Sequence, residues 1–212
     1  MLVVGKREQI VEVAMNLILK KGYSHTSVED ITNEMGIAKG SFYTYFKSKN
    51  LLLQNLVEKK IEEMKEKQEA ILQKDFSFEE TLKNIVLVRL KFSYESMKRE
   101  LVLISLIKNI EALGPEIREL IKKIEQLNIE FMKRFLIKFK DNLNVERKDL
   151  IRYSELISAV IREFKVSSFF LDKGENENIF IQDFDIVMEK MSNDKLEEGI
   201  DFIYNCILKM LK

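Results

Sequence analysis

The sequence predicts an all-α protein, and three features of its composition and periodicity indicate this fold class. Its 212 residues include one proline and seven glycines, the two residue types that most often interrupt helices. Apolar residues recur three and four positions apart over most of the chain, which is the spacing of amphipathic helices. Hydrophobic residues make up 46% of the sequence, enough to build one or two cores at this length. We therefore expect long helices that pack around apolar cores.

Composition also excludes several classes of protein. The longest nearly apolar run, Leu101 to Ile107, is interrupted only by Ser105 and is far shorter than the roughly 18 residues of a membrane span. Leu2 to Val4 is too short for a secretory signal, so we expect a cytoplasmic protein without a membrane partner. With one cysteine, Cys206, and one histidine, His25, thiolate and histidine metal sites are unsupported. No metal and no cofactor are expected.

Two short helices should follow a longer first one. The first helix has an apolar face and should end before Gly22, which can adopt a left-handed cap; the face comprises Ile10, Val13, Ala14, Leu17 and Ile18. A capping box, either Thr26 with Glu29 or Ser27 with Asp30, should begin the second helix, which Gly36 ends. The third should cover Lys39 to Phe46, and Ser48 should cap a long helix from about Asn50. This order is typical of a helix-turn-helix.

The third helix is unusual in its side chains. From Lys39 to Lys49 there are three cations and no acid, with hydroxyl side chains between them. Helical spacing directs Phe42 and Phe46 to the core and Tyr43, Thr44 and Lys47 to solvent. Such a surface suits a phosphate-lined groove, where cations displace counterions and hydroxyls donate to phosphates or base edges. A solvated turn with incidental aromatic residues is the alternative.

Residues 7–53 resemble the DNA-binding domain of the TetR family of bacterial transcriptional regulators. The resemblance is carried by Gly22-Tyr23, Thr26-Ser27-Val28, Ile31, Gly36, Lys39-Gly40-Ser41, Tyr43, Phe46 and Ser48-Lys49. It implies that the third helix enters the major groove of DNA, with six residues at or near the duplex: Lys39, Gly40, Ser41, Tyr43, Thr44 and Tyr45. It also implies that Thr26, Ser27 and Lys49 hold phosphates near helix N-termini.

Three positions depart from the family pattern. Ala38 stands where Ser or Thr is common and removes a side-chain cap worth about 1 kcal/mol. Tyr45 replaces a frequent histidine, and Thr32 replaces alanine, with its hydroxyl expected to bond back along its own helix. His25, in the preceding loop, is either an exposed or backbone-bonded side chain or a phosphate contact beside Thr26.

Beyond residue 50 the sequence predicts further helices. A long helix carries the stripe Leu53, Val57, Ile61, Met64 and Ile71, and later helices are expected at about 77–97, 99–112, 115–140, 146–172 and 194–211. Pro115 suits the first turn of a helix. Residues 179–191 fit a short helix or an extended segment. We expect a helix-turn-helix domain over 1–50 and a helical ligand-binding and dimerisation domain over 51–212.

Two apolar stripes near the C-terminus suit either an internal core or an association surface. The family resemblance implies a four-helix bundle with a second copy of the chain, through Tyr153, Ile157, Val160, Phe164, Ile200, Ile203, Ile207 and Met210. A homodimer also agrees with the DNA argument, because one short helix reads few base pairs and two half-sites are usually read by a dimer.

The resemblance also implies a small-molecule inducer, whose identity does not follow from the sequence. The absence of clustered charge on the apolar stripes favours a lipophilic or acyl compound. Met and Phe side chains can line an adaptable apolar pocket, or they can simply fill a core. The candidates are Met64, Phe92, Tyr94, Met97, Phe131, Phe135 and Tyr153.

Together these features predict a ligand-responsive repressor that binds a palindromic operator as a dimer and is released by its inducer. The alternatives are a ligand-independent regulator, an activator, a helical scaffold and, least of all, a helical enzyme. The enzyme is disfavoured because no Glu-x-x-His pair and no Gly-rich phosphate loop are present. The net charge is zero for the whole sequence, but the charges are unevenly distributed along it. Residues 1–50 carry seven cations and five acids, whereas residues 172–201 carry three cations and ten acids.

Overall fold

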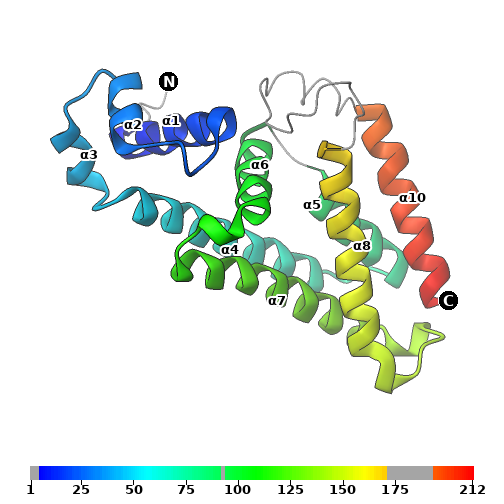
Figure 1. The fold of residues 1–212 in the computed structure, drawn as a ribbon. Coiled ribbons are helices and arrows are strands. Elements are labelled where there is room, and N and C mark those ends of the chain that lie inside the picture. Colours follow the sequence, from blue (N-terminus) through cyan, green and yellow to red (C-terminus); the bar gives the residue numbers. More distant parts are fainter. Residues whose placement is uncertain (1–4, 92–93, 171–192) are drawn as a thin grey trace. The chain divides into compact units, whose positions relative to one another are not determined.

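A computed structural model describes residues 5–91, 94–170 and 193–212, and all regular structure in these ranges is helical (Figure 1). The α-helices are α1 (Lys6–Lys21), α2 (Val28–Glu34), α3 (Lys39–Tyr45), α4 (Lys49–Leu72), α5 (Phe78–Leu90), α6 (Tyr94–Lys108), α7 (Pro115–Lys138), α8 (Leu150–Phe170) and α10 (Asn193–Leu211). Short 3₁₀ turns cover Ile110–Ala112, Lys140–Asn142 and Arg147–Asp149. The all-α prediction is confirmed. No helix in the described ranges is long and apolar enough to cross a membrane.

The described residues form two compact units. The head unit comprises residues 5–60 and 94–121, and the body unit comprises 61–91, 122–170 and 193–212. The segment of the predicted helix-turn-helix domain therefore shares its unit with α6 and the start of α7. The functional boundary at residue 50 stays a prediction.

In the head unit, α1, α2 and α3 enclose a small apolar cluster. Its fully or nearly fully buried members are Ile10, Ala14, Ile31, Phe42, Phe46 and Leu52. As predicted, α1 ends before Gly22, whose φ of 84° suits a residue without a side chain and whose N–H donates to Ile18 O at 2.8 Å. Gly36, with φ of 61°, follows α2 in the same way.

A capping box fixes the start of α2 and decides between the two predicted pairs. Ser27 Oγ accepts the Asp30 N–H at 3.0 Å, and the Asp30 carboxylate accepts the Ser27 N–H at 2.7 Å. Asp30 also forms an ion pair with Lys21 at 2.8 Å. The side-chain bonds from Lys21 and Ser27 lower the pKa of Asp30 far below its usual range. Asp30 thus ties the end of α1 to the start of α2.

Acid should loosen this connection. Because the folded-state pKa of Asp30 is lowered, its contribution to stability is complete above the unfolded value of about 3.9 and is lost as pH falls below that value. We expect the melting temperature of the wild-type chain, followed by circular dichroism, to fall more steeply below about pH 4 than that of Asp30→Asn. Parallel pH profiles for the two proteins would contradict this role.

The sequence predicted one continuous helix over 77–97, but the structure has two separate helices, α5 and α6, in this region. Instead α5 ends at Leu90, Lys91 is extended with φ of −94° and ψ of 125°, and α6 runs without interruption past the predicted break near residue 98. Neither glycine nor proline occurs between residues 77 and 113. The break has a tertiary cause, because α5 packs on α10 in the body unit whereas α6 packs on α1 in the head unit.

Two ion pairs hold α6 within the head unit. Lys98 pairs with Glu12 of α1, and Lys60 of α4 pairs with Glu100 at 2.7 Å. The Glu100 side chain is only 7% exposed. One ion pair therefore connects α6 to α1, and the other connects α6 to α4.

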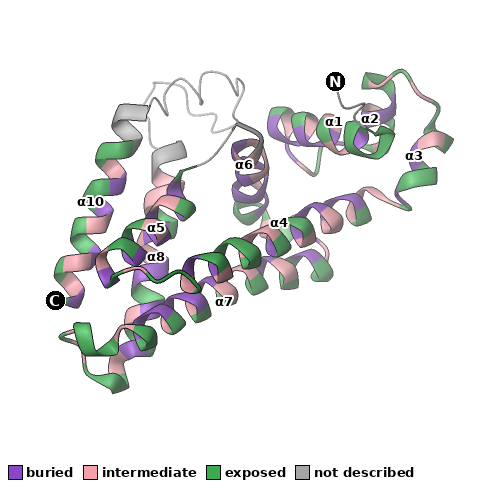
Figure 2. Cartoon of the chain, turned by 180° about the vertical axis from the view of Figure 1, so that it is seen from behind, coloured by how far each residue is buried: buried purple, intermediate pink, exposed green. Residues whose placement is uncertain are grey.

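The body unit has one apolar core, built from the end of α4 with α5, α7, α8 and α10 (Figure 2). Phe78 stacks on Phe135 with ring centroids 5.4 Å apart and planes 12° apart. Within the same unit a buried amide pair, Gln68 with Asn128, is joined by a hydrogen bond of 3.2 Å. Between α7 and neighbouring helices, Arg134 pairs with Glu69 and Arg162 pairs with Glu125.

Most of the other predicted elements are confirmed. Pro115 opens α7, the stripe from Leu53 to Ile71 lies on α4, and α10 covers the last predicted helix. In place of a helix from residue 146, a 3₁₀ turn precedes α8, which begins at Leu150. The ambiguous segment 179–191 lies outside the described residues.

Candidate nucleic-acid interface

Helix α3 has one buried face and one exposed face, as its sequence predicted (Figure 2). Phe42 is fully buried and Phe46 is 3% exposed, so both anchor the helix in the head cluster. On the other side Tyr43 is 48% and Tyr45 is 41% exposed. Lys39, Gly40, Thr44 and Lys47 are also exposed, and Ser41 is half-buried. Six predicted DNA contacts thus lie on one short, accessible helix that contains no acid.

Gly40 is not required by packing inside the chain. A Cβ atom built at this position would meet nothing within 4 Å. The glycine therefore leaves the outer surface of the first turn of α3 open to the close approach of another molecule. The preceding Ala38 makes no side-chain cap, as predicted, and the Thr44 hydroxyl donates back to Gly40 O at 3.3 Å.

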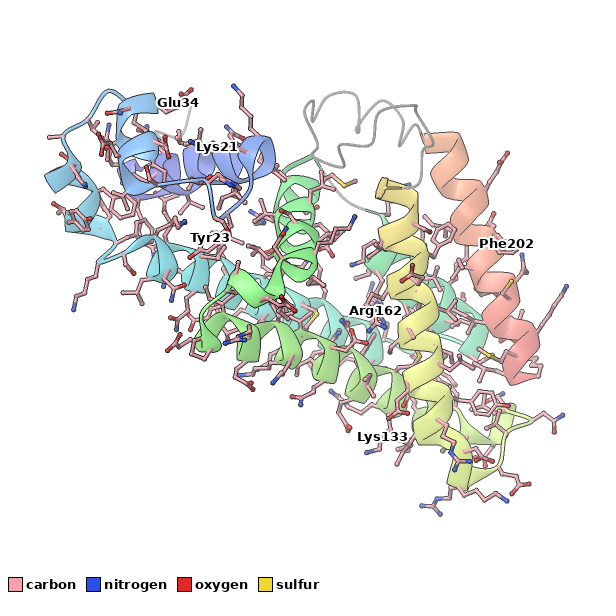
Figure 3. The ribbon with its side chains drawn as sticks, in the orientation of Figure 1. Lys21, Tyr23, Glu34, Lys133, Arg162 and Phe202 are labelled. Atoms are coloured by element: carbon pink, nitrogen blue, oxygen red, sulfur yellow. The ribbon has the colours of Figure 1, made fainter. Side chains whose placement is uncertain are left out.

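Lys49 makes internal contacts that the sequence did not predict. Its Nζ donates to Tyr23 O at 2.7 Å and to Thr26 O at 2.6 Å, and it lies 3.9 Å from the centre of the Tyr23 ring, which is labelled in Figure 3. Burial lowers the pKa of Lys49, while the nearby Asp30 carboxylate acts in the opposite direction. The ammonium group holds the loop between α1 and α2 against the first turn of α4. This geometry favours a structural role for Lys49 over a phosphate contact.

The two other predicted phosphate contacts also have internal partners. Thr26 is 1% exposed and its hydroxyl donates to Gly22 O at 2.8 Å, so it closes the turn after α1. Ser27 is exposed, but both its hydroxyl and its N–H are bonded to Asp30. His25 is exposed, which is compatible with both of its interpretations. Thr32 Oγ1 donates back to Glu29 O at 3.1 Å, as predicted.

A second contact fixes the start of α4. The Tyr23 hydroxyl donates to Asn50 Oδ1 at 3.2 Å, and burial raises the pKa of this phenol. On its other side Asn50 borders Gly114, where an added Cβ would lie 3.3 Å from Asn50 Nδ2. Tyr23 and Asn50 are 27 positions apart, so no local spacing could have indicated this contact.

Comparison with known proteins identifies the family of this domain. A family model described as bacterial regulatory proteins of the tetR family matches residues 10–56. Residues 10–56 thus form a domain of the tetR type. The match begins within α1 and ends within α4, so the TetR domain contains most of α1, all of α2 and α3, and the first turns of α4.

Relatives of the TetR domain are named as regulators, not as enzymes. YerO of Bacillus subtilis, an uncharacterized HTH-type transcriptional regulator, is 46% identical over 48 residues, which are 23% of this chain and 17% of YerO. An uncharacterized HTH-type regulator in the lacX 3′ region of Lactococcus lactis is 27% identical over 91% of this chain and 95% of its own. The alignments with YerO and with two further Bacillus subtilis regulators, YuxN and YvdT, cover only 17, 18 and 28% of those proteins.

Similarity in fold extends over the whole chain. The fatty acid degradation regulator FadR of Bacillus halodurans superimposes with a TM-score of 0.70 and 20% sequence identity, covering 97% of this chain and 96% of FadR. At this level of identity the similarity shows the fold alone. The helices that follow residue 56 therefore share their fold with FadR.

The predicted ligand-binding residues are divided between the two units. Met97 is buried in the head unit, and Met64 is half-buried in the body unit. Phe131 and Phe135 belong to the body core, and Tyr153 packs against it. Phe92 lies outside the described residues, and so does the side chain of Tyr94. Phe131 and Phe135 are thus buried in the body unit, a position that suits both a core and an internal apolar pocket.

The predicted dimer stripes lie mostly inside the body unit. Ile157, Ile200, Ile203 and Ile207 are at most 4% exposed and belong to the core of the chain itself. Tyr153, Val160, Phe164 and Met210 are partly buried and pack against the same core. The four isoleucines are therefore core residues, because α8 and α10 turn this stripe toward α5.

Proposed function

We propose that this chain is a sequence-specific DNA-binding regulator of transcription that inserts α3 into the major groove. The observation that carries the proposal is the exposed face of α3, where Lys39, Tyr43, Thr44 and Tyr45 project from a helix without acidic residues. Phe42 and Phe46 hold the opposite face in the head core. Cationic and hydroxyl groups on a rigid helix match a surface of phosphates and base edges.

The contacts divide into two groups in this proposal. Lys39, Gly40, Ser41, Tyr43, Thr44 and Tyr45 form the DNA surface. Thr26 and Lys49 hold the loop between α1 and α2 in place, and Ser27 begins α2 while remaining at the surface. This division limits the DNA-contacting residues to α3 and its flanks.

The test is in vitro selection of duplexes from a random pool, followed by binding to the selected duplex over a salt series. We expect log K to fall linearly with log salt concentration, as for proteins that displace counterions from DNA. No selected sequence, or a flat salt response, would contradict the regulator and favour a helical scaffold.

Tyr43→Ala should change sequence preference as well as affinity. Tyr43 is exposed at the centre of α3, where a side chain that reaches a base contributes about 1–3 kcal/mol of discrimination. Lys39→Ala is the comparison, since loss of a phosphate contact weakens all duplexes alike and lowers the salt slope by about one. Repeating the selection with each variant measures both effects. An unchanged preference for Tyr43→Ala would reassign Tyr43 to phosphate positioning.

We further propose a homodimer that reads two half-sites of a palindromic operator. The buried isoleucines are not accessible to a second copy of the chain. Large apolar side chains that remain exposed on α8 and α10 are the alternative dimer contact. Ile151 is 53%, Leu156 49% and Phe202 63% exposed, and Cys206 is exposed one turn beyond Phe202. The helices α8 and α10 lie side by side (Figure 1), and Gly199 of α10 borders the Phe164 ring of α8. Exposed apolar side chains on neighbouring helices can contribute to an association surface.

We also propose that this regulator is a repressor and that it responds to a small lipophilic or acyl inducer. Phe131, Phe135 and Tyr153 belong to one apolar region of the body unit, and FadR, which shares the fold, is named as a regulator of fatty acid degradation. An inducer can shift the protein only by its differential affinity for the state that does not bind DNA. Fatty acids of graded length should raise the melting temperature and reduce duplex binding together. A set without effect on either measurement would exclude this ligand class.

A further inference from the structure

Arg7, on the first turn of α1, makes two contacts with elements far along the chain. Its guanidinium carbon lies 4.8 Å from the centre of the Phe46 ring, at the end of α3. Its Nη2 donates to Asn55 Oδ1 on α4. One exposed side chain therefore joins α1, α3 and α4, although 39 positions separate Arg7 from Phe46.

Phe46 determines where α3 ends. It is extended, with φ of −138° and ψ of 122°, and its N–H donates to Phe42 O at 3.0 Å, which closes the last turn. The Phe46 ring lies 5.9 Å from the Phe42 ring, and the Phe42 ring lies 5.5 Å from Tyr43 at 87°. A continuous row of ring contacts thus leads from Arg7 to Tyr43, which is exposed on the proposed DNA surface.

We infer that Arg7 is a positioning residue for DNA reading: it holds Phe46 against α1 and α4 and so fixes the last turn of α3 and the direction of Tyr43. The inference rests on the proposed function. A side chain in this role must lie over the Phe46 ring and donate a hydrogen bond to Asn55 at the same time. Arginine meets both requirements, whereas the ammonium group of lysine supplies charge without the planar fork.

Charge and geometry can be separated by substitution. Arg7→Lys keeps the positive charge and removes the planar group, and Arg7→Ala removes both. Lys6→Ala is the matched control, because it removes an exposed cation from the neighbouring position of the same helix turn. Each variant is measured for affinity to the duplex selected with the wild-type chain, for salt slope, for melting temperature and for hydrogen exchange of the amides in residues 42–47.

If Arg7 positions α3, Arg7→Lys and Arg7→Ala should both bind the duplex about three- to thirtyfold more weakly, the range expected for losing a cation–π contact and a hydrogen bond. Arg7→Lys should keep the wild-type salt slope, and the Phe46 amide should exchange faster in both variants while amides of α2 stay protected. Lys6→Ala should leave exchange at Phe46 unchanged.

Two results would overturn the inference. Wild-type affinity for Arg7→Lys, with a salt slope lower by about one for Arg7→Ala, would make Arg7 a phosphate contact. Unchanged exchange at Phe46 in both variants would show that Arg7 does not hold the end of α3. Failure of the wild-type chain to select any duplex would overturn the proposed function itself, and with it this role of Arg7.

Discussion

Phe202→Glu is expected to convert the protein into a monomer of 25.1 kDa and to weaken binding to a palindromic duplex by about 100-fold or more. Phe202, labelled on α10 in Figure 3, is 63% exposed and is the most exposed large apolar side chain among the described residues. A charge at the centre of an apolar contact must be desolvated without a partner, which opposes association. A monomer has only one α3, so it loses the additional affinity that a dimer gains by binding both half-sites of the duplex at once.

Sedimentation velocity at micromolar concentration measures the first effect, and titration of the selected duplex measures the second. Ile107→Glu is the matched control, since Ile107 is 45% exposed but lies on α6 of the head unit. A bis-maleimide that links Cys206 to a second copy in the wild-type chain and not in Phe202→Glu would give independent support. Wild-type chain that sediments as a monomer, or Phe202→Glu that remains a dimer, would contradict this surface.

Lys49→Met is expected to lower the free energy of unfolding by about 1–3 kcal/mol, the range for hydrogen bonds to a charged group in a partly buried site. Methionine keeps the aliphatic part of the side chain but leaves Tyr23 O and Thr26 O without the ammonium donor. The contact with the Tyr23 ring is lost as well. Urea unfolding followed by circular dichroism measures the change.

Lys47→Ala provides the comparison for Lys49. Lys47 is an exposed cation two positions earlier, so its loss should reduce the salt slope of DNA binding with little effect on stability. Wild-type stability for Lys49→Met, together with a salt slope lower by about one, would return Lys49 to the phosphate role that the family resemblance implies.

Features with a local physical cause were predictable from the sequence. Gly22 and Gly36 end helices because their positive φ angles suit a residue without Cβ. Pro115 begins a helix because the first turn needs no donor there. The two faces of α3 follow from the 3.6-residue period alone, which buries Phe42 and exposes Tyr43. The fold class and most of the predicted DNA surface were therefore determined by the sequence itself.

Features that depend on distant partners were decided only by the tertiary structure. The break after Leu90 has no glycine or proline to mark it and arises because α5 and α6 pack in different units. The sequence shows that Ile157 and Ile203 lie on apolar stripes, but a stripe fits a core and an interface equally well until its neighbours are known. Likewise the charge of Lys49 is evident from the sequence, whereas its two carbonyl partners, 23 and 26 positions away, are not. Periodicity and turn chemistry act between near neighbours, and the partners of a side chain are set by how the helices pack.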